Sequence, residues 1–166
     1  MKKLASRSAQ WPLTAEFTFN YNDWVVDSVD GAKKTFGSTV ANSVDPAETG
    51  LTAGTGLVFD CIPMPVGAVI EDVKVQVETA FAGIGAGATL SLGIAGSTTA
   101  LVNAQDLDAA VAGAQLTVAS YNQLLCNSGQ NIRLTTSGLT ATATAGKVRI
   151  RVRYTIDGRA NENTIH

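Results

Sequence analysis

Apolar and polar residues alternate along the stretch Lys147-Val148-Arg149-Ile150-Arg151-Val152-Arg153-Tyr154-Thr155-Ile156-Asp157. Successive side chains of a β-strand point to opposite faces of the sheet, so this pattern predicts a strand with one dry face and one cationic face. The same alternation recurs in Phe17–Tyr21 and in Val73–Thr79. We therefore expect a protein built from half-buried strands.

Further segments have the composition of strands, and turn residues such as Asp45-Pro46 and Ser137-Gly138 separate them. The predicted strands are Thr14–Asn22, Lys33–Val40, Gly56–Ile62, Val66–Ile70, Asp72–Phe81, Ala88–Ala95, Gln115–Ala119, Gln130–Thr136, Leu139–Thr144 and Lys147–Ile156. Many short strands joined by glycine-rich turns indicate a β-sandwich or a β-barrel. The sequence lacks the strict internal repeat that a propeller would show.

We expect an all-β fold, a jelly-roll-like antiparallel β-sandwich with at most one short helix. That helix is predicted over residues 103–112. Asn103 can cap its N-terminus, the carboxylate of Asp106 lies three residues later, and Gly113 can end it.

The length of 166 residues suits a single domain with its own hydrophobic core. We expect an N-terminal arm over residues 1–13, one β-sandwich domain over 14–157 and a C-terminal tail over 158–166. The opening Met1–Gln10 lacks the run of about 7–15 apolar residues that a secretion signal needs. No stretch approaches the roughly 20 apolar residues of a membrane span, so we expect a soluble protein made in a cytoplasm, with no membrane partner.

Charged residues are only 16% of the chain, against about 25% in a typical soluble domain. The net charge is −2, with basic residues gathered near both ends and most carboxylates between Glu16 and Asp108. A weakly charged surface with this split favours association with copies of itself or with a larger assembly. A monomer whose surface is solvated by Ser and Thr stays open as the alternative.

No catalytic or metal-binding set stands out in the sequence. General acid–base chemistry near neutral pH usually depends on His, and the one His is the last residue, His166. Cys61 and Cys126 have no second Cys or His at metal-ligand spacing, so we expect small buried hydrophobes. The pair Asp106 and Asp108 fits capping better than catalysis, and the glycine-rich runs lack a phosphate-loop lysine. We expect no enzyme activity, no metal and no cofactor.

The cationic row of Lys147, Arg149, Arg151 and Arg153 has several interpretations. An ion-paired subunit contact or a solvated strand edge is favoured, because Arg is enriched at protein interfaces and lysine-like charges protect strand edges. Pairing inside one chain with Glu78 or Asp72 stays open. A reader of a nucleic-acid backbone is disfavoured, because the chain is acidic overall and no stacking aromatic shares this face.

Several segments together resemble the small virion proteins of tailed bacteriophages, in particular head decoration (cement) proteins. The segments that carry the resemblance are Ile62-Pro-Met-Pro-Val-Gly-Ala-Val-Ile70, Val73–Phe81, Leu90-Ser-Leu-Gly-Ile94, Ala100-Leu-Val-Asn-Ala-Gln-Asp-Leu-Asp-Ala-Ala110 and Val152-Arg-Tyr-Thr-Ile-Asp-Gly-Arg-Ala-Asn-Glu162. The resemblance covers roughly Gly56 to Glu162. It implies a β-sandwich that assembles as homotrimers outside a capsid lattice, without a cofactor. It identifies no individual functional residue.

The expected function is therefore that of a non-enzymatic virion structural protein, which binds the major capsid protein on the outer surface of a phage capsid and stabilises the shell. The alternative is a receptor- or glycan-binding module of a phage tail or fibre, for which Trp11, Trp24 and Tyr121 could supply an aromatic platform. From the charge pattern we expect these interface residues: Lys2, Lys3, Arg7, Trp11, Lys147, Arg149, Arg151 and Arg153.

Overall fold

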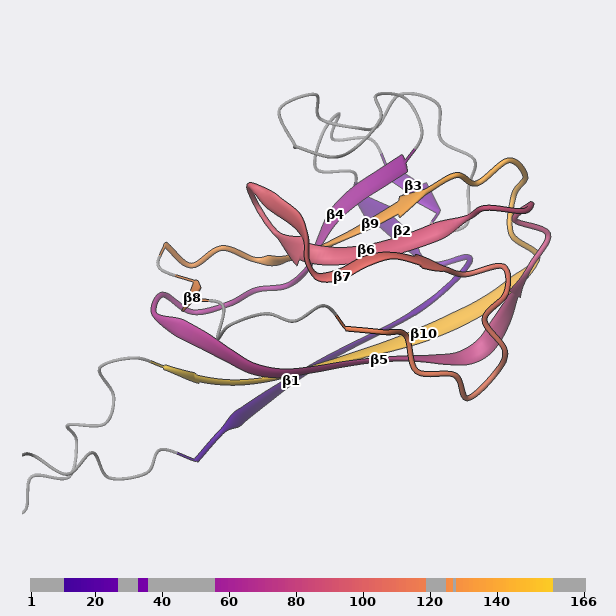
Figure 1. Ribbon diagram of the computed structural model, residues 1–166. Helices are drawn as coiled ribbons and strands as arrows, with labels where there is room; N and C mark the ends of the chain where they lie inside the picture. The colour runs from indigo at the N-terminus through magenta and orange to yellow at the C-terminus, as the bar shows by residue number, and fades with distance from the viewer. Residues whose placement is uncertain (1–10, 27–32, 36–55, 119–124, 127, 157–166) are drawn as a thin grey trace, which may run out of the picture.

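Two antiparallel sheets lie face to face in the computed structural model of the protein (Figure 1). The structure describes residues 11–26, 33–35, 56–118, 125–126 and 128–156. Most of the predicted arm and tail, including Lys2, Lys3, Arg7 and His166, lies outside these described residues. The predicted two-sheet antiparallel sandwich is confirmed.

Each of the two sheets has four strands. The first sheet has the order β1-β10-β5-β8, with bounds Leu13–Asn20, Ala145–Ile156, Ala68–Ala82 and Leu125–Cys126. The second has the order β4-β9-β6-β7, with bounds Gly56–Ile62, Ile132–Ser137, Thr89–Ile94 and Ser97–Asp106. A separate hairpin pairs β2, Trp24–Val26, with β3, Lys33–Thr35.

The order of the strands shows how the chain alternates between the sheets. Beyond β4, only β6 and β7 are consecutive neighbours within one sheet. Each other step from β4 to β10 passes from one sheet to the other. The last strand, β10, lies between β1 and β5 in the middle of the first sheet, while the first strand, β1, lies at the edge of that sheet.

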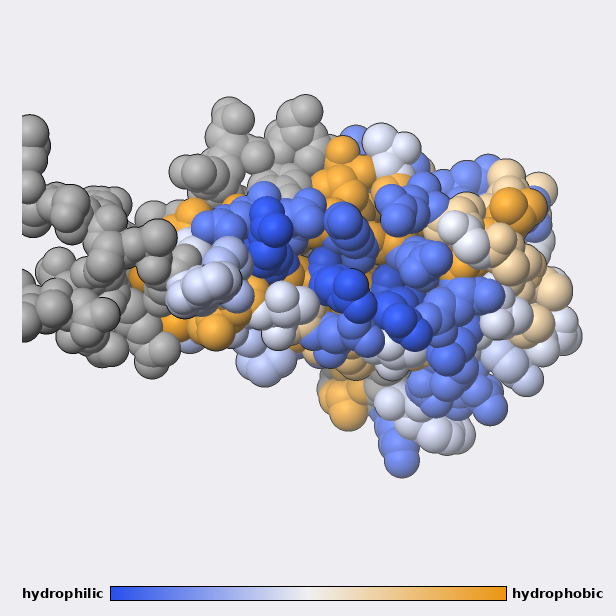
Figure 2. Space-filling model, turned by 90° about the horizontal axis from the view of Figure 1, so that it is seen from below, coloured by the Kyte–Doolittle hydropathy of each residue, from blue (hydrophilic) through white to orange (hydrophobic). Residues whose placement is uncertain are grey.

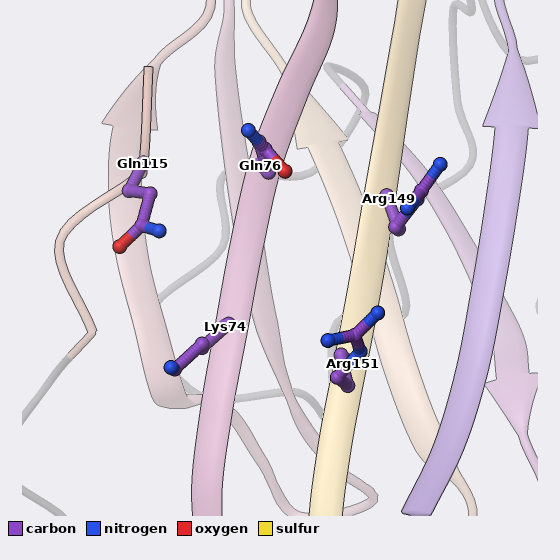
Figure 3. Close-up of a pocket in the computed structure, with 5 residues that line it drawn as sticks. All are labelled: Lys74, Gln76, Gln115, Arg149 and Arg151. Carbon is purple, nitrogen blue, oxygen red and sulfur yellow. The ribbon is translucent and has the colours of Figure 1, made fainter. Parts of the chain in front are cut away.

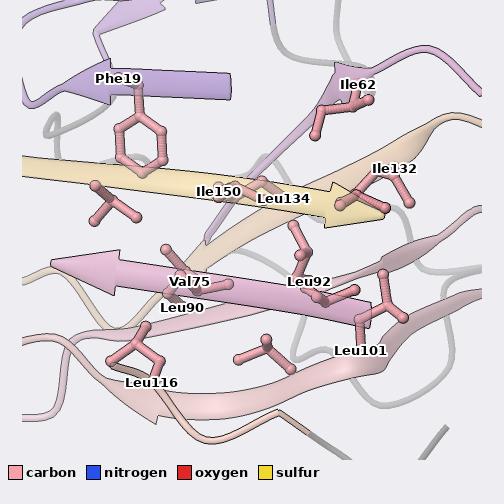
Figure 4. Packing of buried hydrophobic residues seen from close by; sticks show 14 of the residues in the cluster. Phe19, Ile62, Val75, Leu90, Leu92, Leu101, Leu116, Ile132, Leu134 and Ile150 are labelled. Carbon is pink, nitrogen blue, oxygen red and sulfur yellow. The ribbon is translucent and has the colours of Figure 1, made fainter. Parts of the chain in front are cut away.

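The core fills the space between the two sheets (Figure 4). Val75 and Ile150 from the first sheet face Leu92 and Leu134 from the second, and all four are fully buried. Burying such a side chain contributes roughly 1.5–3 kcal/mol of transfer free energy. The alternation in the sequence places these residues on one side of each strand, so the sandwich follows directly from the period of two.

Strand β5 is longer than the sequence suggested. The sequence predicted two strands, Val66–Ile70 and Asp72–Phe81, but one strand runs from Ala68 to Ala82 through the polar pair Glu71-Asp72. A register shift between Arg153 and Tyr154 of the partner β10 absorbs the irregularity opposite this pair. A β-bulge of this kind lets the apolar face continue on both sides of the interruption.

The predicted helix over residues 103–112 is wrong. Asn103 lies inside β7, and the described residues contain no helix. The carboxylate of Asp106 instead accepts the backbone N–H groups of Asp108 and Ala109, at 2.8 and 3.1 Å. An Asp side chain satisfies such donors in a turn as readily as at a helix start, so the capping signal alone did not distinguish the two.

The strand predicted over Leu139–Thr144 is also absent. This segment lies against the turn after β5, where Thr140 donates to the carbonyl of Ile84 at 3.0 Å and Thr144 to that of Ala82 at 2.8 Å. The predicted strand at Gln115–Ala119 is reduced to an isolated bridge between Gln115 and Gln76. Strands β2, β7 and β8 were not predicted.

Candidate interface

Strand β10 carries the cationic row along the outer face of the first sheet. Its alternate residues Val148, Ile150 and Val152 are fully buried in the core, which turns the charged side chains outward. The sheet neighbours are β1 on one side and β5 on the other. Figure 2 looks at this layer from below and shows strongly hydrophilic residues gathered over the middle of the face.

The row is paired with carboxylates of the same chain. The ammonium of Lys147 lies 2.8 Å from Glu78, and Arg149 forms an ion pair with the same carboxylate. Arg151 donates to Glu16 through Nη2 at 2.9 Å and Nε at 3.1 Å. The hydrogen bond from Lys147, followed by the charge of Arg149, holds the pKa of the Glu78 carboxyl below its usual range against the opposing effect of burial.

The interpretation that kept pairing with Glu78 open is therefore confirmed, while the ion pair of Arg153 is made with Glu71, at 3.7 Å, rather than with Asp72. Exposed pairs of this kind contribute only about 0–1 kcal/mol each to stability. Their main effect is to fix the side chains of the row in a ladder between β1, β10 and β5.

A hollow of about 190 Å³ opens on this face beside the ladder (Figure 3). Its lining residues are Lys74, Gln76, Gln115, Arg149 and Arg151. Register explains why they meet: Arg151 is the cross-strand partner of Lys74, Arg149 is that of Gln76, and Gln115 bridges to Gln76 from the other side. Three cations and two amides therefore line one hollow.

The exposed aromatic residues lie away from the hollow. Trp11, which precedes β1, is 88% exposed, and Trp24 on the β2–β3 hairpin is 62% exposed. The ammonium of Lys33 lies 5.2 Å from the centre of the Trp24 ring. Tyr121 lies outside the described residues. The structure thus gives Trp11 and Trp24 the exposure that a docking role requires, but it does not bring them into contact with the cationic row.

The thiols lack the environment of a nucleophile. Burial raises the pKa of Cys61 to about 12, and its Sγ lies 3.3 Å from the carbonyl oxygen of Ile132. Burial also raises the pKa of Cys126, which lies in the core. Both thiols therefore stay protonated near neutral pH.

In the part of the chain that the structure describes, no group of three or more His, Cys, Asp or Glu side chains could hold a metal ion. The described residues also contain no helix long and apolar enough to cross a membrane.

Sequence reasoning found Arg149 and Arg151 but missed the other lining residues of the hollow, Lys74, Gln76 and Gln115. Lys74 and Gln76 belong to the alternating stretch Val73–Thr79, so their outward direction was predictable. Their position beside Arg149 and Arg151 depends on the register between β5 and β10, which a single sequence does not specify.

No protein-family model and no curated protein matches the chain. Among solved structures, the chain is similar to a chain of the structure described as the cyanophage Pam1 capsid asymmetric unit. The TM-score is 0.57 at 18% sequence identity, and the match covers 92% of this chain and 92% of that chain. A likeness at this identity shows a shared fold, and here it extends over nearly the whole of both chains.

Proposed function

We propose that the chain is a non-enzymatic structural protein of a bacteriophage particle, which binds the outside of the capsid shell and stabilises it. The observation that carries this proposal is the shared fold with a chain of a cyanophage capsid unit, over 92% of each chain. Because the likeness covers nearly the whole chain and not a single hairpin, we infer a comparable role for this protein, as a rigid block in a shell.

The strand order supports the same class of role. We propose that the sandwich is a jelly roll, and the support for this is that two four-stranded sheets are joined by a chain that alternates between them. Jelly rolls serve in viral capsid and lectin domains. Such a sandwich is a stiff block, because its interior is packed at the density of organic crystals.

Stabilisation of a shell follows from mass action. A protein that binds the assembled shell and not its separated subunits raises the free energy needed to break the lattice. Many weak contacts repeated over a particle add up, because each further contact is intramolecular. We propose the major capsid protein as the partner, a homotrimer as the assembled unit, and the residues that precede β1 as an arm that contributes to attachment.

Sedimentation with shells tests the proposal. Purified protein is mixed with capsid shells of the encoding phage from which this chain has been removed, and the shells are pelleted. We expect saturable binding and a higher temperature of shell disruption when the protein is bound. A dissociation constant of about 10 µM corresponds to a weak binding free energy of about −7 kcal/mol. If the protein stays in the supernatant at concentrations well above about 10 µM, the proposal is contradicted.

A receptor- or glycan-binding role is the second candidate, and the exposed Trp24 favours it. Sugar rings stack on aromatic side chains, and Trp24 is 62% exposed at the start of β2, where it pairs with Thr35 at the end of β3. The two roles separate in one variant: Trp24→Ala abolishes adsorption of phage to host cells under the second candidate and leaves shell binding unchanged. Under the leading proposal adsorption is unaffected.

A further inference from the structure

The hollow between β5 and β10 has an unbalanced set of charges. All three charged residues that line it are cations, Lys74, Arg149 and Arg151. Figure 3 shows Lys74 on β5, Arg149 and Arg151 on the adjacent β10, and Gln115 on the neighbouring segment. Two uncharged amides complete the lining, and no carboxylate belongs to it.

Two carboxylates of the same face are each shared between two cations. Glu16 forms ion pairs with both Arg149 and Arg151, and Glu78 with both Arg149 and Lys147. Lys74 forms no ion pair with any described residue, and its side chain is exposed. The described cations around the hollow therefore outnumber the carboxylates that neutralise them.

Arg149 adds a second, independent observation. Its Nε–H is buried and has no hydrogen-bond acceptor among the described residues. The oxygen of Glu16 that faces this nitrogen lies 3.7 Å away, beyond hydrogen-bond distance. Buried donors in native proteins are nearly always satisfied, so the described residues of this face supply one hydrogen-bond acceptor too few for Arg149.

We propose that the hollow is an anion site that receives a carboxylate side chain of the protein surface on which the sandwich docks, so that the outer face of β5 and β10 is the docking side of the molecule. This inference rests on the proposed function for the identity of the partner. Guanidinium and amide donors together match the planar, two-oxygen geometry of a carboxylate.

The surroundings of the hollow favour a carboxylate over a nucleic acid. No aromatic side chain lines the hollow, so no base can stack there. Glu16 on β1 and Glu71 and Glu78 on β5 lie beside the cationic row. Their charges repel a polyanion that follows the row. A single carboxylate fits between them, because it needs only the cations at the centre.

The first experiment uses the free protein and does not depend on the proposed function. The Arg149 Nε–H signal is followed by NMR during a titration with sodium acetate, against sodium chloride at equal ionic strength. We expect a saturating shift with acetate, absent in Lys74→Gln and retained in Arg153→Gln, the matched change on the same row outside the hollow. Equal shifts in both salts, no shift, or a shift with inorganic phosphate only would overturn the site.

The second experiment measures binding to the stripped shells. Lys74→Gln should raise the concentration for half-maximal occupancy about tenfold, a loss of about 1.4 kcal/mol, while Arg133→Gln, on β9 of the second sheet, changes it less than about twofold. If the wild type binds but the two variants bind equally well, this face is not the docking side. If the wild type fails to bind shells, the proposed function fails and the acetate titration alone decides the anion site. If the protein binds duplex DNA and Lys74→Gln abolishes that binding, the ligand of the hollow is a phosphate and the proposed carboxylate is wrong.

Discussion

Glu78 on β5 joins two neighbouring cations of β10, because its carboxylate is shared by Lys147 and Arg149. Its pKa is lowered in the folded protein, first by the hydrogen bond from Lys147 and then by the charge of Arg149. A carboxyl with a depressed folded pKa stabilises the fold above its unfolded pKa and loses that contribution as the pH falls through the folded value.

Glu78→Gln should therefore lower the melting temperature at pH 7 and have a progressively smaller effect as the pH falls below the ordinary Glu pKa of 4.5. Thermal melting between pH 7 and pH 3 measures this convergence. Glu71→Gln is the matched control, since its 3.7 Å contact with Arg153 is longer and should give a smaller difference. A constant difference between wild type and Glu78→Gln across the range would show that the carboxylate's charge is not responsible.

Gly146 shows how tightly the bulge of β10 is packed. Its φ is +146°, and a Cβ at this position would overlap the ring of Phe81. The register shift that contains it also lets its carbonyl accept the N–H of Tyr21, at 2.9 Å. The position therefore needs glycine both for its backbone conformation and for the space.

Gly146→Ala should destabilise the fold by roughly 1–3 kcal/mol, measured by denaturant unfolding. Gly96→Ala provides the control, because Gly96 also has a positive φ, +80°, while a Cβ there would meet nothing within 4 Å. The control gives the cost of a side chain at a positive φ in open space. If Gly146→Ala loses no more stability than Gly96→Ala, overlap with Phe81 is not what makes glycine necessary at this position.

At the scale of elements, the sequence predicts best where alternation is uninterrupted. Residues 147–156 alternate without a break and form the greater part of β10, and the bounds of β4 match the prediction at both ends. The helix prediction over residues 103–112 failed because Asn103 and Asp106 have the side-chain chemistry of helix caps, and a turn uses the Asp106 carboxylate equally well. Local chemistry identifies such a segment as an end of an element without specifying which element.

The candidate site was only half predictable for a similar reason. The direction of Lys74 follows from alternation within one strand, but its meeting with Arg151 and Gln115 depends on three segments far apart in the sequence. Pairing over such distances is set by the crossings between the sheets and by a bulge, neither of which leaves a local signal.

The start of β1 gives a test of the proposed arm. Leu13 is already paired with Tyr154 in the first sheet, so a deletion that ends at Trp11 removes the exposed ring and leaves the strand intact. Protein lacking residues 1–11 should melt within about 2 °C of the full chain and bind shells several-fold more weakly. Thermal melting and shell sedimentation measure the two properties.

Trp11→Ala in the full chain separates the ring from the basic residues that precede it. A loss equal to that of the deletion assigns attachment to the ring. If the truncated protein occupies shells as tightly as the full chain, the arm is not an anchor and attachment depends on the sandwich.

At the scale of the whole molecule, the low charge content becomes easier to interpret. The described charges are concentrated on the ladder of the first sheet, and the chain as a whole has 16% charged residues. Surfaces so poor in charge associate readily. The proposed homotrimer would cover part of this surface with copies of the same chain.

Light scattering coupled to size exclusion tests the oligomer. We expect a mass three times the 17.2 kDa of one chain at micromolar concentration. Repeating the measurement at 1 M salt, where the Debye length is about 3 Å, shows whether charge contributes to assembly. A mass of one chain under both conditions contradicts the homotrimer.

Cryo-electron microscopy of the particle of the encoding phage tests the central claim most directly. The account predicts density on the outer surface of the head, at fixed positions of the lattice, into which the two sheets fit with the outer face of β5 and β10 toward the shell. Density for this chain only on the tail or fibres, or none on the head of particles that contain the chain, would contradict it.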